Sequence, residues 1–305
     1  MDIITNLKDI IPFLNFIKKG KFNEKIGTFI LIGGSSYKCI DFDKYNVNKY
    51  DNFYRKFKYE VEYPNINFQT RLSQASTTFS FDRPTDLLNH NLYRDEQYKK
   101  IYIASLRDLT IKKYSDFLYN LFVYHKLKPP YIFIVFSEGG YDVMCFTKYY
   151  SSLIKKIFFI DTPLLDKYMI KFEKFRGNID WLNNLINKKK FSVNNTKLKD
   201  INEIDRELLE KIDIYNFEVK TLNIIAKLKV SDFPKNIPII ILWSPYFDSA
   251  TKISKEKVAI IDEMNKKLDN YNNITYMYLN APHQMERVIP ITLSKFIITS
   301  IISAF

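Results

Sequence analysis

The chain has 305 residues, of which 46% are hydrophobic and 16% aromatic, with only 7 glycines. This composition excludes a disordered chain and suffices for one large α/β domain with an insertion, or for two smaller domains. The formal net charge is +12, from 46 Lys and Arg against 34 Asp and Glu. Because the lysines are scattered in short runs, we interpret this charge as an A/T-rich coding bias and expect no specific nucleic-acid partner.

Cysteine usage and the two ends of the chain indicate the compartment. Cys39 and Cys145 are the only cysteines, and they provide neither a disulfide framework nor the spacing of a zinc site. The N-terminus has no basic segment followed by a long apolar one, which predicts no signal peptide. The apolar tail at 289–305 is interrupted by Pro290 and Lys295 and is too short to span a bilayer. We therefore expect a cytoplasmic protein without a membrane span.

The chain begins with a predicted amphipathic helix, because apolar residues recur at helical spacing from Leu7 to Ile17. A continuous apolar run, Thr28–Ile32, follows and ends in Gly33-Gly34. Such a run is typical of a central parallel strand that is buried on both faces. Residues 40–70 are polar and aromatic without a clear period, and we expect them to be irregular.

Strands and helices then alternate. Apolar runs predict further strands at 77–81, 131–136 and 157–160. Helices are expected at 103–127, where Pro129-Pro130 ends the pattern, and from the turn after residue 136 to Tyr150. The third of these strands ends at Asp161.

The segment 162–236 differs from its surroundings, because it is charged, helical in pattern and poor in strand-like runs. Helices are expected within it at about 164–175, 181–188 and 201–228. Beyond it the sequence predicts a strand at 237–243, a helix at 254–269, a strand at 274–279 and a helix at 290–304. Alternating strands and helices imply right-handed βαβ units. We predict an α/β fold with a mostly parallel sheet flanked by helices, made of residues 1–161 and 237–305, with 162–236 as a helical cap.

Ser137 lies where a predicted strand turns sharply into a helix. A nucleophilic serine in such a turn adopts strained dihedrals, and its neighbours must be small because the strand and the helix pass close together. Gly139 and Gly140 meet that need. The competing interpretation is that Ser137 caps the helix. The paired glycines favour the nucleophile, because a cap alone would not require them.

A serine hydroxyl needs a base, and histidine suits neutral pH. His125 is expected at the end of a helix, where its charge would favour the helix dipole. His90 is expected in a solvated polar loop after Asp82-Arg83, which we interpret as a structural ion pair or loop anchor. His283 lies in a loop between the last strand and the last helix, and it is the candidate base.

The segment Phe136–Gly140 resembles the nucleophile elbow of α/β-hydrolases, whose pattern is small-x-Ser-x-small. Further segments resemble, in chain order, the ends of that family's fourth and sixth strands, its acid-bearing turn and its histidine loop: Ser80-Phe81-Asp82-Arg83-Pro84, Ile160-Asp161-Thr162-Pro163, Leu242–Asp248 and Asn280-Ala281-Pro282-His283. Together they cover the chain from about residue 28 to its end. The sequence departs from the pattern at Val135, a β-branched residue where glycine or alanine is usual, and its side chain is expected to crowd the turn.

The resemblance implies a serine hydrolase that acts through an acyl-enzyme. Ser137 would be the nucleophile, His283 the base and Asp248 the acid that orients the imidazole. Asp161 is the rival acid, and its structural alternative is a helix N-cap. A carboxylic ester is the expected substrate, with amides second, and the cap would exclude water from the acyl pocket.

The resemblance also implies an oxyanion hole, with donors from the amide of Glu138 and from the loop that contains Gly34 and Ser35. A plain Gly-Gly turn is the equally weighted alternative for that loop. No cofactor or metal site is expected, and the partner would be a small-molecule or acyl substrate. The alternative function is a catalytically inactive binding or structural protein on the same fold, which Val135 supports.

Overall fold

The computed structural model describes residues 7–34, 38–43, 62, 67–83, 110–162, 232–246 and 253–303. Within them, a seven-stranded sheet has the order β1-β3-β2-β4-β5-β6-β7. The strands are β1 (Phe16–Lys19), β2 (Thr28–Ile32), β3 (Thr78–Phe81), β4 (Tyr131–Phe136), β5 (Ile154–Ile160), β6 (Ile239–Trp243) and β7 (Ile274–Tyr278). Neighbouring strands are parallel except β1 and β3, which are antiparallel. The predicted α/β fold with a mostly parallel sheet is confirmed.

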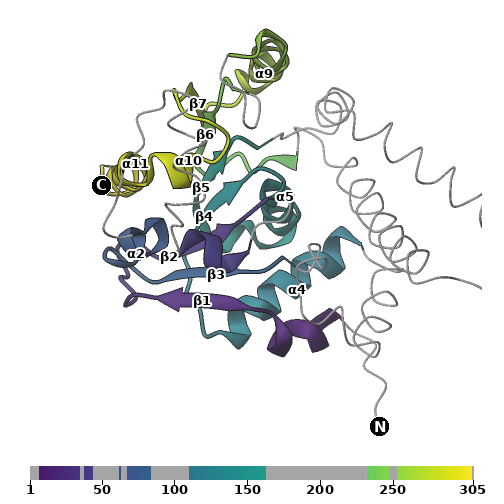
Figure 1. The fold of residues 1–305 in the computed structure, drawn as a ribbon. Coiled ribbons are helices and arrows are strands. Elements are labelled where there is room, and N and C mark those ends of the chain that lie inside the picture. Colours follow the sequence, from purple (N-terminus) through teal and green to yellow (C-terminus); the bar gives the residue numbers. More distant parts are fainter. Residues whose placement is uncertain are drawn as a thin grey trace, which may run out of the picture.

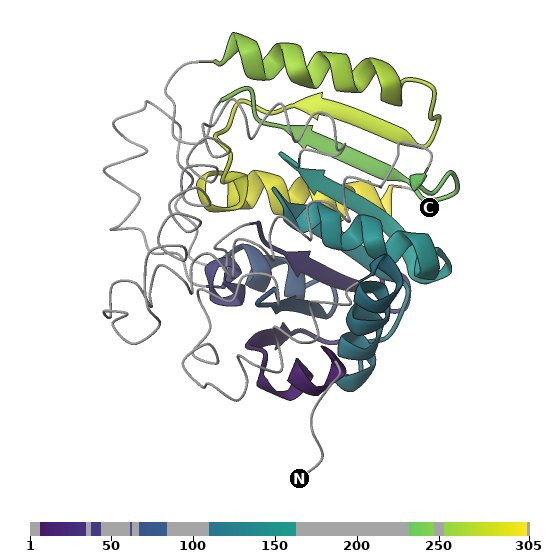
Figure 2. The ribbon, with the colours of Figure 1, turned by 90° about the vertical axis from the view of Figure 1, so that its right-hand side faces the viewer.

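Helices cover both faces of the sheet (Figures 1 and 2). They are η1 (Leu7–Phe13), η2 (Cys39–Phe42), α2 (Phe68–Ser73), α4 (Ile111–Tyr124), α5 (Gly139–Tyr150), η5 (Ser151–Leu153), α9 (Lys255–Leu268), α10 (Met285–Val288) and α11 (Pro290–Ile302). The apolar sides of α4, α5 and α9 pack on one face, and those of α2, α10 and α11 pack on the other.

The central strands are buried on both sides, as their continuous apolar runs predict. In β2, Ile30 and Ile32 belong to the core under α4 and α5, whereas Phe29 and Leu31 belong to the core under α2 and α11. Successive side chains of a strand point to opposite faces, so every position of such a strand must be apolar. The same reasoning accounts for β4, in which each residue from 131 to 136 is buried.

The predicted N-terminal helix is wrong beyond residue 13. The 3-10 helix η1 contains Pro12 and ends at Phe13, and the next residues form the edge strand β1. Phe16 lies opposite Phe81 and Lys19 opposite Thr78 in the antiparallel pair with β3. Proline has no backbone N–H to donate and disrupts a continuing helix. Pairing with a distant strand then outweighs the local helical spacing.

Other boundaries differ more modestly. The stretch 40–70 was expected to be irregular, but it contains most of η2 and the start of α2. The short helix α10 was not predicted, and β5 begins three residues earlier than expected. The first part of the helix predicted at 103–127 lies outside the described residues, as do residues 163–231 of the predicted cap, so the cap stays a prediction.

His125 lies at the C-terminal end of α4 as expected, but it does not act as a cation there. Its ring packs 4.0 Å from the ring of Phe16 and 4.9 Å from that of Phe79, measured between centroids. Burial lowers the pKa of His125, and the nearby Lys18 cation lowers it further. The ring is therefore neutral at neutral pH, which corrects the expected interaction with the helix dipole.

Asp82 and Arg83 anchor the loop after β3 through different partners. The carboxylate of Asp82 accepts hydrogen bonds from the Cys39 amide at 2.6 Å and from the Asn15 side chain at 2.9 Å. Arg83 forms a buried two-point ion pair with Asp142 of α5, at 2.8 and 3.2 Å. This pair connects the end of β3 to α5, which begins two residues after Ser137.

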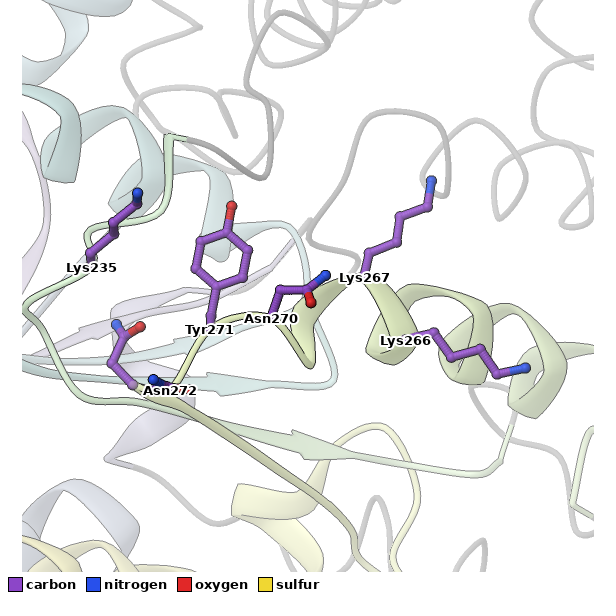
Figure 3. Close-up of a pocket in the computed structure, with 7 residues that line it drawn as sticks. Lys235, Lys266, Lys267, Asn270, Tyr271 and Asn272 are labelled. Atoms are coloured by element: carbon purple, nitrogen blue, oxygen red, sulfur yellow. The ribbon is translucent and has the colours of Figure 1, made fainter.

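An open pocket of about 810 Å³ lies at the amino ends of β6 and β7 (Figure 3). Its lining is basic and amidic: Lys235, Lys266, Lys267, Asn270, Tyr271, Asn272 and Asn273. Lys235 precedes β6, and Asn273 precedes β7. The pocket is thus at the opposite edge of the sheet from the predicted site. No helix in the described ranges is both long and apolar enough to cross a bilayer.

Candidate active site

The order of the strands reverses at β2. The chain leaves β2 for β3 on one side of it and returns to β4 on the other side. In an open parallel sheet, ligands bind outside the carboxyl ends of the strands at such a reversal. Gly33-Gly34 follows β2 and Ser137 follows β4, so both segments lie at this position.

Ser137 has the strained backbone of a nucleophile elbow. Its φ is 49°, in a region that residues other than glycine rarely adopt. The turn is held by hydrogen bonds from the Ser137 amide to the Ile160 carbonyl, at 3.0 Å, and from the Gly140 amide to the Ser137 carbonyl, at 3.2 Å. The N-cap of α5 is Glu138, so Ser137 does not hold the capping position. Its side chain is largely buried, with 9% of the residue exposed.

The glycines around Ser137 are required by close approach. A methyl group on Gly139 would overlap the Gly33 carbonyl oxygen, and one on Gly140 would overlap the Thr162 side chain. At Gly34 a methyl carbon would come within 2.6 Å of the Ser137 Cβ and 3.0 Å of its Oγ. The loop after β2 therefore lies directly against the Ser137 side chain.

Val135 does not prevent the elbow from forming. It is fully buried and lies in register between Ile32 of β2 and Phe159 of β5. Its side chain belongs to the core under α4 and α5. The positive φ of Ser137 is present with this valine in place.

His283 and Asp161 are brought together from segments 122 residues apart. The imidazole Nδ1 lies 2.5 Å from the Oδ2 of Asp161, whose side chain is almost completely buried. Asp161 has a φ of 47°, and its other carboxylate oxygen accepts a hydrogen bond from the Ser244 amide at 3.1 Å. The ends of β5 and β6 and the loop after β7 thus meet at one carboxylate.

Burial alone would raise the pKa of Asp161, but the Lys257 cation and the hydrogen bond from His283 outweigh it and lower that pKa. Asp161 is therefore a carboxylate at neutral pH, and the Nδ1 of His283 carries the proton of their hydrogen bond. That tautomer makes Nε2 the ring nitrogen that can take a proton from an alcohol.

Sequence reasoning missed Lys257. Its Nζ lies 2.6 Å from the Oδ2 of Asp161 and donates to the Tyr246 carbonyl at 2.7 Å. Its side chain is only 6% exposed. A signal was available, because Lys257 shares a helical stripe with Ile261, Met264 and Leu268, which are all buried. A lysine on the apolar stripe of a helix needs a buried partner.

Solved structures resemble the whole chain, although no family model and no curated protein sequence matches it. A hydrolase from Oleispira antarctica is 15% identical over 97% of both chains, with a TM-score of 0.52. An α/β hydrolase enzyme from a Medee basin deep-sea metagenome is 11% identical over 95% of this chain and 94% of its own, with a TM-score of 0.50. The chain has the α/β-hydrolase fold. AqDC, which recognises the Pseudomonas quinolone signal and cleaves its ring, also shares this fold, at 11% identity and a TM-score of 0.52 over 95% of this chain and 96% of its own.

The α/β-hydrolase fold predicted from the ordered motifs is confirmed, whereas the roles of individual residues stay predictions. Asp248, Ser35 and His90 lie outside the described residues. The contact of His283 is with the rival acid, Asp161. Within the described ranges, no group of three or more His, Cys, Asp or Glu residues could hold a metal ion.

Proposed function

We propose that this protein is a serine hydrolase that cleaves a carboxylic ester through an acyl-enzyme. Ser137 is the nucleophile, His283 is the base, and Asp161 orients the imidazole. The observation that carries the proposal is the 2.5 Å contact between His283 and the buried Asp161, at the same edge of the sheet as the strained Ser137 turn. The strained conformation of Ser137 costs free energy, and such conformations are found mainly at functional sites. The strain therefore favours a functional role for Ser137.

The reaction proceeds in two halves. His283 accepts the hydroxyl proton as the Ser137 Oγ bonds to the carbonyl carbon, and the imidazolium is stabilised by Asp161. The tetrahedral intermediate then expels the alcohol, which takes the proton from His283. Water, deprotonated by the same imidazole, hydrolyses the acyl-enzyme and restores Ser137.

The negative oxygen of the intermediate needs donors that are already in place. We propose the amide of Glu138 and an amide of the loop containing Gly34 and Ser35. The tight approach of Gly34 to the Ser137 Cβ and Oγ supports this assignment, because it brings the loop backbone beside the reacting hydroxyl.

The proposed substrate is a small acyl ester, with amides second, and the segment 162–236 is the proposed cap over the acyl group. The hydrolase from Oleispira antarctica, which shares the fold, is consistent with a hydrolytic activity. A cytoplasmic setting is also proposed, since Cys39 and Cys145 are buried free thiols.

A fluorophosphonate probe tests the nucleophile. Labelling should occur on the peptide that contains Ser137 and should disappear in Ser137→Ala and His283→Gln. Ser152→Ala, at an exposed serine just after α5, is the matched control and should label normally. Turnover should be assayed on aryl esters with short and long acyl chains.

Absence of labelling in the folded wild-type protein, together with no ester turnover, would contradict the proposal. It would favour the alternative, a catalytically inactive binding protein on the same fold. Labelling that survives in Ser137→Ala would instead identify a different nucleophile.

A further inference from the structure

We propose that Lys257 is a positioning residue of this site, which shares the Asp161 carboxylate with His283 and compensates the negative charge that the imidazole faces. The inference rests on the proposed function for its catalytic meaning. Its geometric basis is independent of the reaction, because two donors from different elements meet on one carboxylate oxygen.

Among the residues that the structure describes, three donors contact the side chain of Asp161. Lys257 Nζ and His283 Nδ1 both contact Oδ2, at 2.6 and 2.5 Å, and the Ser244 amide donates to Oδ1 at 3.1 Å. The carboxylate cannot rotate without breaking at least one of these bonds. Lys257 also donates to the Tyr246 carbonyl at 2.7 Å, so it joins the segment after β6 to the acid.

The charge of Lys257 matters because the ion pair between Lys257 and Asp161 is buried. The side chains of Lys257 and Asp161 are 6% and 2% exposed, so solvent screens their charges weakly. A lone carboxylate beside an imidazole strongly favours the imidazolium. Lys257 compensates that negative charge, and the imidazolium of His283 is stabilised less. Without Lys257 the imidazole would face an uncompensated buried carboxylate.

Charged groups on the neighbouring segments of the described ranges have charged partners of their own. On α10, Glu286 lies 3.4 Å from Arg287, which also lies 3.4 Å from Asp41. Beside Ser137, Glu138 lies 4.0 Å from Arg83. These pairs remain in a variant that changes only Lys257, so such a variant isolates the contribution of that lysine.

Proton NMR of the imidazoles gives a direct readout, because the chain has only 3 histidines. The signal of His283 is assigned by its loss in His283→Gln. In Lys257→Met its titration midpoint should move to higher pH by about one pH unit or more, the scale of a single close charge. Lys257→Arg retains the charge and should keep the wild-type midpoint. Lys266→Met, the same change at an exposed position of α9, should also keep it.

The rate of fluorophosphonate labelling should change in the same direction. At a pH below both midpoints, Lys257→Met should label about tenfold more slowly than wild type for each pH unit by which the midpoint rises. A residue that only supported the fold would lower the amount of folded protein without moving this pH profile.

If Lys257→Met does not fold, the comparison of Asp161→Asn with Asp161→Asn/Lys257→Met replaces it. Removing the lysine from the first variant should again raise the imidazole midpoint. An unchanged midpoint in whichever pair folds, or an equal rise in Lys257→Arg, would overturn the inference. Absence of Ser137 labelling in the wild type, together with no ester turnover, would refute the proposed function only, since the NMR comparison does not require catalysis.

Discussion

Lysines have different surroundings at the carboxyl edge of the sheet, where the parallel strands end, and at the amino edge, where they begin. The helix α9 contributes a lysine to each edge. In its first turn, Lys257 is buried and bonded to Asp161 at the carboxyl edge. In its last turn, Lys266 is exposed and lines the open pocket at the amino edge (Figure 3). The helix C-terminus favours cations by itself, so Lys266 needs no specific partner. Burial, and not the presence of a charge, distinguishes a candidate functional lysine here.

The largest expected effect distinguishes the two acids that the sequence offers. Asp161→Asn should lower ester turnover by about 10⁴-fold, because the imidazole loses both its orientation and its compensating charge. Asp248→Asn should leave the turnover nearly unchanged. Steady-state kinetics on one aryl ester measures both. A larger loss in Asp248→Asn than in Asp161→Asn would contradict the assignment of Asp161.

Replacing Lys257 should reduce the stability of the protein more than replacing Lys266, at the other end of α9. Lys257→Met leaves the Asp161 carboxylate buried without its cation, and we expect the free energy of unfolding to fall by about 3 kcal/mol or more. Lys266→Met should change it little, because the residue is exposed. Urea unfolding measures both variants. An equal loss of unfolding free energy in both variants would contradict a special contribution of the buried Lys257 to stability.

The two ends of the parallel strands each contain a tightly packed glycine. Gly139→Ala meets the Gly33 carbonyl at the carboxyl edge, and Gly27→Ala meets the Pro130 carbonyl at the amino edge. Each should destabilise the fold by about 1–3 kcal/mol through overpacking, and Gly27→Ala also through the φ of 104° at that position. Only Gly139→Ala should also slow labelling of the folded fraction. Slowed labelling in Gly27→Ala would mean that general loosening, and not the elbow, controls the reaction.

A smaller change is expected in how the contribution of Asp161 to the free energy of unfolding depends on pH. The lowered pKa of Asp161 means that its stabilisation is complete above the pKa of an unfolded aspartate, about 3.9, and is lost as pH falls through the folded value. The stability difference between wild type and Asp161→Asn should therefore narrow in acid, by at most about 1.4 kcal/mol per pH unit. Unfolding curves at several acidic pH values measure it. A difference that stays constant down to the acid limit would argue against the pairing.

Much of the fold could be predicted because the local signals were strong. The apolar run 131–136 corresponds to β4, and the predicted end of the next helix at Tyr150 is the observed end of α5. β1 was missed because it has only four residues and is half exposed, so its conformation depends on pairing with β3 and not on its own sequence. α2 was missed for a related reason, since it is a six-residue helix inside a stretch without a clear period.

The alternation of strands and helices and the positions of Ser137 and His283 could be predicted from the sequence, because each is marked by residues next to it in the chain. The contact of His283 with Asp161, and the second contact of this carboxylate with Lys257, could be found only in the folded chain. Those contacts join residues 122 and 96 positions apart. Contacts at such separations depend on how the strands lie side by side, and no periodicity within one element records that order.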